Sequence, residues 1–221
     1  MLKISYKTSN LFSLKKYNDS NLNCQSYAYP TLYGLRCAIL GSVIQVDGIE
    51  KAQELFHKIK NAIIYVQYPN QYQSNGMRIK RYTNSSYKKK YKKINLQSTD
   101  KKEECFSELG QLNGLTQMGY REYIDLDNII FYIDKSVPDI EMYLKNIDWI
   151  GTAESLVYLE SIQEVNSLKN VMVLWNEDID EVTYEQYDWD KKITFENVYM
   201  YSKKRKHLNK KIIAYISDLH I

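Results

Sequence analysis

A long insertion between two strand-like runs is the feature of this sequence that most constrains its fold. The run Ala62–Tyr68 is rich in β-branched and aromatic residues and is closed by Pro69, and a regular pattern returns only at Asn128–Asp134. The segment between them, 69–127, is much longer than the turn that two neighbouring strands need. Long insertions inside a domain are usually functional or disordered, so this segment is the first place to look for a function.

The chain before the insertion has the pattern of a strand followed by helices. Residues 2–6 alternate apolar and polar side chains, which is typical of a half-buried strand. Apolar helices are predicted over Thr31–Val46 and Ile49–Ala62, and Asp47 with Glu50 has the capping-box spacing at the start of the second. Together with the strand that precedes the insertion, these elements make one β–α–β half.

After the insertion the same order returns. A strand over Asn128–Asp134 leads to a helix over Pro138–Ile147, with proline in its first turn, and then to a strand over Ser155–Val165. Two such halves with an antiparallel centre predict an α+β fold of the ferredoxin-like type, which is also the fold of RNA-recognition modules. We expect residues 1–165 to form this domain, including the insertion, and residues 166–221 to add a β-rich extension packed on it.

The insertion contains a basic segment, Arg78–Lys93, that has no acidic residue. Lysine and arginine attract phosphates in a salt-dependent way, and tyrosine rings stack on unpaired bases, a combination that suits single-stranded nucleic acid. The arms Met77–Tyr82 and Tyr87–Leu96 are predicted to pair as a hairpin, and the alternative is a charged loop without a ligand. The candidate RNA-binding residues of the segment are Arg78, Lys80, Arg81, Tyr82, Tyr87, Lys88, Lys89, Lys90, Tyr91, Lys92 and Lys93.

The tail carries charge of both signs in separate places. Residues 177–190 are acidic and could contact a protein partner. Lys203–Lys206, with Lys210 and Lys211, form a second basic patch, which is either a solvated strand edge or a further RNA contact. Strands are predicted in the tail over Val171–Trp175, Ile193–Met200 and Lys211–Ile216.

Cysteine and histidine usage argues against disulfide and metal sites. The three cysteines lie far apart without CxxC spacing, which suits a reducing compartment, and the three histidines lack the spacing of metal ligands. We expect neither a metal nor another cofactor. The N-terminus lacks the pattern of a signal peptide and no run approaches the length of a membrane span, so the expected location is cytoplasmic.

Three short sequence patterns lie on either side of the basic segment, one before it and two after it. They are Tyr29–Arg36 (YPTLYGLR), Tyr120–Ile124 (YREYI) and Trp149–Val157 (WIGTAESLV). With this order and spacing, the sequence resembles the fifth CRISPR-associated protein family, which belongs to the RAMP superfamily and supplies a subunit of the type I Cascade surveillance complex. The resemblance spans residues 1–165, and the tail matches only in being β-rich.

The resemblance implies a subunit that caps the 5′ handle of the CRISPR RNA (crRNA) and supports complex assembly in antiviral defence. Its implied partners are the crRNA handle, the Cascade backbone subunit and the large subunit. Carried onto this sequence, the family's hairpin thumb lies within Gly76–Leu96, and Arg36 is a candidate handle contact from the first helix, with a plain helix-surface charge as the alternative. Arg121 and Glu122 are expected to form an ion pair at the base of the thumb.

One branch of the resembled family cuts precursor crRNA with a tyrosine, a lysine and a histidine. The basic segment here has no histidine, and the single Lys-His dipeptide, Lys206-His207, lies in the tail. We therefore expect RNA binding without cleavage. A metal-independent endoribonuclease and a mainly protein-interacting subunit are the alternatives.

Overall fold

The computed structural model describes residues 1–9, 11–16, 19, 23–81, 117–152, 155–174, 184–206 and 208–221. The chain divides into two units. Unit 1 comprises residues 1–15, 26–75 and 123–221, and unit 2 comprises residues 16–25 and 76–122.

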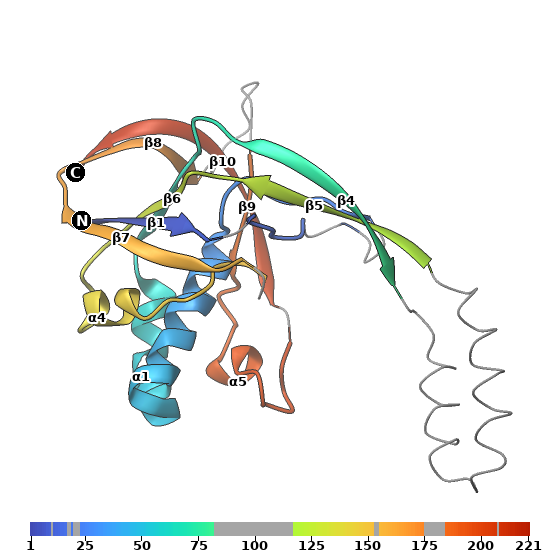
Figure 1. Ribbon diagram of the computed structural model, residues 1–221. Coiled ribbons are helices and arrows are strands. Elements are labelled where there is room, and N and C mark those ends of the chain that lie inside the picture. Colours follow the sequence, from blue (N-terminus) through green and yellow to red (C-terminus); the bar gives the residue numbers. More distant parts are fainter. Residues whose placement is uncertain are drawn as a thin grey trace, which may run out of the picture. The chain divides into compact units, whose positions relative to one another are not determined.

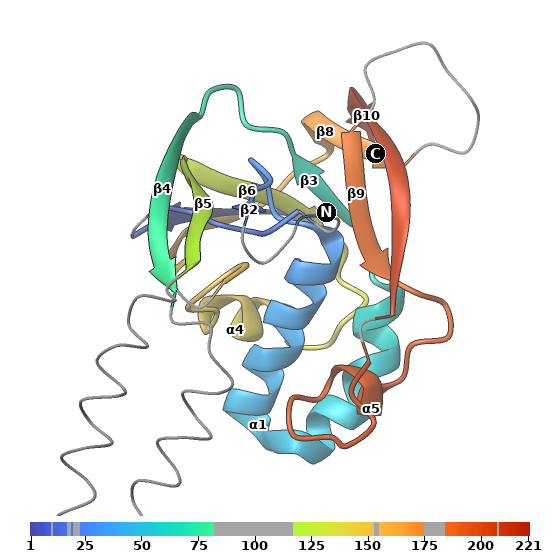
Figure 2. The ribbon, with the colours of Figure 1, turned by 90° about the vertical axis from the view of Figure 1, so that its right-hand side faces the viewer.

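Unit 1 is a mixed α/β structure built on a curled sheet whose neighbouring strands are all antiparallel (Figures 1 and 2). Within the described residues its strands lie in the order β7-β1-β6-β3-β8-β10-β9. Their bounds are β1 Leu2–Thr8, β3 Ile64–Gln67, β6 Asn128–Ile133, β7 Val157–Glu164, β8 Ser167–Leu174, β9 Tyr184–Trp189 and β10 Asn209–His220.

The main core lies between this sheet and the helices α1 (Leu32–Asn61) and α4 (Ile140–Lys145), which cover one of its faces (Figure 1). Strand β1 contributes Leu2, Ile4 and Tyr6, all buried, and Ile4 lies opposite Phe131 of β6. The ring of Tyr6 stacks on that of Phe131 with the centroids 6.0 Å apart. The alternation seen in the sequence therefore places the apolar side of β1 under the helices.

The two helices predicted between β1 and β3 are both present, and they join at a kink within α1. Thr31 caps α1 by accepting a hydrogen bond from the Gly34 N–H at 3.1 Å, and the helical geometry is interrupted at Gly48, with φ 86° and ψ −179°. The preceding residue, Asp47, accepts a 2.6 Å hydrogen bond from the hydroxyl of Tyr143 on α4. The break thus lies where the sequence separates two helical patterns, and α4 packs beside it.

By length and composition alone, α1 could cross a membrane. In unit 1, however, α1 is a core helix, because Leu35, Ile39, Val43, Leu55 and Ile59 are almost completely buried within the protein.

The tail is where sequence and structure differ most. The strands predicted over Val171–Trp175 and Lys211–Ile216 correspond to β8 and β10, but the strand predicted over Ile193–Met200 is wrong, because α5 (Phe195–Val198) lies there. Its start is fixed at Thr194, whose N–H and hydroxyl both donate to the side-chain oxygen of Asn197, at 3.1 and 2.9 Å, and this favours a helical turn over a strand. Strand β9 lies within the acidic stretch, where none was predicted.

Candidate nucleic-acid interface

A smaller sheet holds the beginning and the end of the insertion. Its strands are β2 (Asn23–Cys24), β4 (Gln73–Arg81) and β5 (Gln117–Asp125), in the order β2-β5-β4. Strand β2 runs parallel to β5, with Asn23 opposite Tyr120. Because β4 and β5 are neighbours, the chain enters and leaves the basic part of the insertion along a paired backbone.

Within unit 2, Gly76 of β4 lies against the ring of Tyr120 of β5. A Cβ atom at position 76 would overlap the phenol of Tyr120, so a side chain there would force the ring or the strand to move. Tyr120 is partly exposed and covers the bare glycine backbone. Glycines in strands often mark such a close approach, and an aromatic ring across the pair compensates for the missing side chain.

The first of the predicted RNA-binding residues lie on β4. Arg78 is exposed, and the backbone of Lys80 and Arg81 continues the strand. The predicted arm Met77–Tyr82 therefore begins as a strand, and its neighbour in the described part of the chain is β5. Tyr82, Tyr87, Lys88, Lys89, Lys90, Tyr91, Lys92 and Lys93 lie outside the described residues, as does the predicted second arm, Tyr87–Leu96.

Arg121 and Glu122, expected as an ion pair at the thumb base, both lie on β5 and are half-buried. Both engage in polar or electrostatic interactions. The pairing of one with the other stays a prediction.

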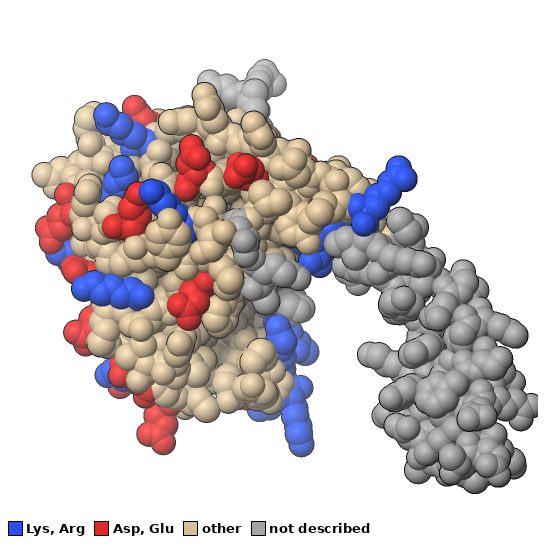
Figure 3. Space-filling model, in the orientation of Figure 1, with Lys and Arg blue, Asp and Glu red and all other residues tan. Residues whose placement is uncertain are grey.

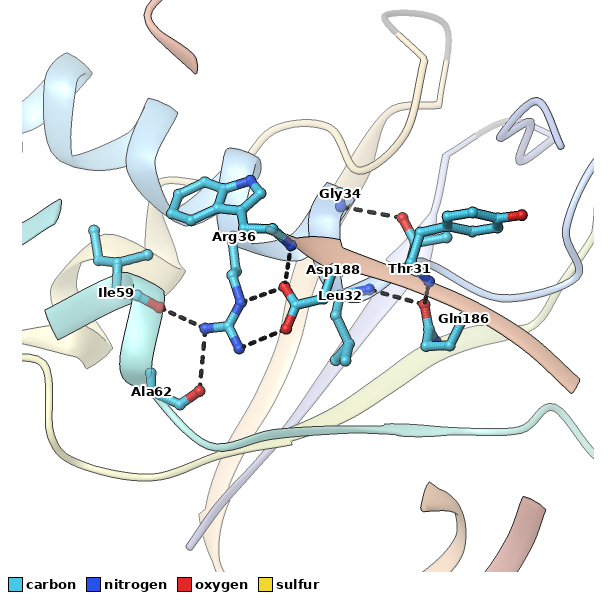
Figure 4. A network of polar contacts seen from close by, with 10 residues as sticks. Thr31, Leu32, Gly34, Arg36, Ile59, Ala62, Gln186 and Asp188 are labelled. Carbon is cyan, nitrogen blue, oxygen red and sulfur yellow. Dashed lines mark hydrogen bonds and ion pairs between the residues drawn. The ribbon is translucent and has the colours of Figure 1, made fainter. Parts of the chain in front are cut away.

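Arg36, the predicted handle contact from the first helix, lies in the interior of unit 1. Its residue exposure is 6%, and its guanidinium makes a two-pronged ion pair with Asp188 of β9, Nε–Oδ1 2.7 Å and Nη2–Oδ2 3.1 Å (Figure 4). Nη1 donates to the carbonyl oxygens of Ile59 and Ala62, at 2.5 and 3.1 Å. A phosphate could reach this guanidinium only by displacing Asp188.

The observed role of Arg36 is structural. The two carbonyls belong to the last turn of α1 and the residue after it, where helix carbonyls lack intrahelical donors, so Arg36 caps that end while binding β9. Neither the predicted handle contact nor the alternative of a helix-surface charge fits this buried position. The signal that sequence reasoning missed is Asp188, an acidic residue on a strand that was not predicted.

A second contact from β9 supports the start of the same helix. The side-chain oxygen of Gln186, a residue 1% exposed, accepts a hydrogen bond from the Leu32 N–H at 3.0 Å (Figure 4). This N–H is among those that a helix leaves without an internal partner. Strand β9 of the tail therefore binds the start of α1 directly and holds the arginine that caps its end.

Comparison with known proteins finds likenesses among solved structures. No family model matches the sequence, and no curated protein sequence matches it. A crystal structure of a CRISPR protein from Archaeoglobus fulgidus is similar to this chain with a TM-score of 0.48 and 11% sequence identity, over 100% of this chain and 86% of that chain.

The histidines of the described chain lie on other elements than β4 and β5. His57 is exposed on α1, with its Nε2 2.8 Å from the side-chain nitrogen of Asn61, and His220 is the last residue of β10. His207, the partner of Lys206 in the single Lys-His dipeptide, lies outside the described residues. Among the described residues, no group of three or more His, Cys, Asp or Glu is arranged as metal ligands.

Proposed function

We propose that this chain is a non-catalytic, cytoplasmic RNA-binding subunit of a type I CRISPR Cascade complex. In this role it caps the 5′ handle of crRNA with the thumb inserted between β3 and β6, and it supports complex assembly with the backbone and large subunits. The observation that carries the proposal is the pairing of β4 with β5 around the basic segment, with Arg78 exposed on β4.

The strand order of unit 1 supports a ferredoxin-like assignment. The elements follow one another along the chain as β1, α1, β3, β6, α4 and β7, and the four strands lie side by side as β7-β1-β6-β3. In this arrangement β1 and β3 flank β6 and are antiparallel to it, which is the pattern of a split β–α–β fold. The insertion then leaves the sheet between its two central hairpin strands, where the resembled family has its thumb.

The chemistry of the segment supports RNA as the ligand. Arg78, Lys80 and Arg81 begin the basic run on β4, and the sequence continues it to Lys93 without an acidic residue. Phosphates bind such a run through charge, and the interspersed tyrosines offer rings to splayed bases.

Two contacts weaken the alternative of a mainly protein-interacting subunit. Within the acidic stretch, Asp188 is bound by Arg36, and Glu185 forms an ion pair with Lys211. These carboxylates serve the fold of unit 1, and fewer acidic groups are left for a partner protein.

The test is the binding of handle RNA to the variant Lys88→Ala/Lys89→Ala/Lys90→Ala at several salt concentrations. Each phosphate contact to single-stranded RNA contributes a slope of about 0.7, so losing three contacts should flatten the salt dependence by about 2. The matched control is Lys58→Ala/Lys145→Ala/Lys169→Ala, which removes three exposed lysines from unit 1. Unchanged affinity and salt dependence in the Lys88→Ala/Lys89→Ala/Lys90→Ala variant would contradict the thumb assignment.

A separate assay tests for cleavage. Purified protein is incubated with precursor RNA in the presence of EDTA, and the RNA is resolved on a denaturing gel. We expect intact RNA. A clean cut at one position would replace the proposed role with that of a metal-independent endoribonuclease.

A further inference from the structure

The loop that follows α5 combines exposed aromatic and basic side chains. We call residues 199–206 the α5 loop; all of them belong to unit 1 and are described. Tyr201 is 77% exposed, the highest value among the large apolar residues of the described surface, and Met200 is 61% exposed. The basic residues Lys203, Lys204, Arg205 and Lys206 follow directly and are exposed.

Tyr201 is the outer end of a chain of aromatic rings that starts in the core. Trp189 stacks on Phe56 at 5.1 Å between centroids, and Phe56 meets Phe195 edge-on at 6.0 Å. Phe195 stacks on Tyr199 at 5.4 Å, and Tyr199 meets Tyr201 edge-on at 5.8 Å. Edge-on and stacked pairs at these distances are favourable, so the exposed ring is held by its neighbours.

Hydrogen bonds fix the backbone of the α5 loop. The side-chain amide of Asn197 donates to the Lys204 carbonyl, and the Lys206 N–H donates to the Asn197 carbonyl, both at 3.1 Å. Ser202 accepts from the Lys204 N–H at 3.0 Å and donates to Glu196 at 2.9 Å. A loop held in this way loses little conformational entropy when a ligand binds.

The basic side chains of the loop have no acidic partner within the described part of the chain. No ion pair joins Lys203, Lys204, Arg205 or Lys206 to a carboxylate there, and Lys and Arg side chains project together beside α5 (Figure 3). The carboxylate of Glu196, on α5, accepts a hydrogen bond from Ser202. Four neighbouring cations next to an exposed ring therefore face solvent.

We propose that the α5 loop is a second nucleic-acid contact that binds a single strand, with a base stacked on Tyr201 and phosphates on Lys203, Lys204 and Lys206. It lies in unit 1 and is separate in sequence from the thumb, so it extends the proposed function beyond the handle. The exposed ring selects a single strand, because paired bases in a duplex have no free face for stacking. An acidic peptide would satisfy the cations and leave the ring without a partner.

The experiment uses the full chain and labelled strands of about 12 nucleotides of RNA or DNA, with a duplex of equal length, measured by fluorescence anisotropy. Tyr201→Ala should weaken binding of both single strands at least about fivefold and leave duplex binding unchanged. The matched control is Tyr158→Ala, which removes a tyrosine 52% exposed on β7 and should change neither. Equal losses in the two variants, or an equal loss on the duplex, would overturn stacking on Tyr201.

The charge arm uses Lys203→Ala/Lys204→Ala/Lys206→Ala, alone and combined with Lys88→Ala/Lys89→Ala/Lys90→Ala. For single strands, the loop variant should reduce the slope of log affinity against log salt concentration by about 2. The combined variant should lose the binding that the loop variant and the thumb variant each retain. If only the thumb variant weakens binding, the α5 loop is not a nucleic-acid contact while the proposed function stands; if only the loop variant does, the thumb assignment fails. If the loop variant binds RNA and DNA strands as tightly as the parent but has lost the parent's binding of labelled polyglutamate, the ligand of the α5 loop is an acidic protein instead.

Discussion

Arg36 and Asp188 are joined by two parallel hydrogen bonds across 152 positions of the chain. The pair links α1 to β9, so a segment near the C-terminal end of the chain supports the helix that follows the first strand. Their side chains are only 7% and 16% exposed. Charges this far from water are tolerated because each one has the other as a partner, and removing either leaves a buried charge uncompensated.

The first prediction concerns this pair. Arg36→Ala or Asp188→Asn should lower the free energy of unfolding by about 3–5 kcal/mol, as measured by urea denaturation. The control is Lys51→Ala, which breaks an ion pair with Glu54 whose side chains are largely exposed and should cost at most about 0.5 kcal/mol. Equal effects at the two sites would contradict the structural role of Arg36.

The second prediction contrasts two glycines of α1. Gly48→Ala should destabilise the protein by about 1–3 kcal/mol, because φ 86° with ψ −179° is a conformation open essentially only to glycine. Gly41→Ala should stabilise it by about 0.5–1 kcal/mol, since Gly41 is helical and a Cβ atom there meets nothing within 4 Å. Thermal unfolding of both variants decides the matter, and a stable Gly48→Ala protein would mean that α1 is continuous.

The third prediction concerns the contact between Gly76 and Tyr120. Gly76→Ala should weaken the pairing of β4 with β5, because the new methyl group overlaps the phenol ring. Hydrogen exchange of the β4 amides measures this pairing and should accelerate in the variant. The double variant Gly76→Ala/Tyr120→Ala removes the overlap and should recover part of the protection. Unaltered exchange in Gly76→Ala would show that the ring moves aside without cost.

The fourth prediction concerns the ionisation of Cys37. Burial raises the pKa of its thiol from 9.0 to about 11. In a Cys24→Ser/Cys105→Ser background, Cys37 of the folded protein should therefore react slowly with a thiol reagent at pH 9 and rapidly once unfolded.

The same shift has a consequence for stability. The folded state holds the Cys37 proton more tightly than the unfolded state, so this contribution is fully present below pH 9 and is lost as the pH rises towards 11. The free energy of unfolding should fall less steeply between pH 9 and pH 11 in Cys37→Ala than in the parent. Parallel curves would show that the thiol ionises normally in the folded protein.

The sequence by itself determined the elements whose side chains repeat with a regular period. The alternation over residues 2–6 and the apolar runs 62–68 and 128–134 predicted β1, β3 and β6, because a strand or helix that buries one face must repeat its apolar residues. The charge of the segment 78–93 could be read in the same way, since its basic residues are adjacent in the chain.

Only the tertiary structure decided what depends on residues distant in the chain. Strand β9 was not predicted because acidic residues interrupt its apolar pattern, and Asp188 can lie half-buried there because Arg36 is its partner. In the α5 loop, the cations and Tyr201 were visible in the sequence, but the ring chain from Trp189 to Tyr201 exists only once α1, β9 and α5 are packed. A local pattern records which face of an element is apolar, whereas the partner of a buried charge or ring is chosen by the fold.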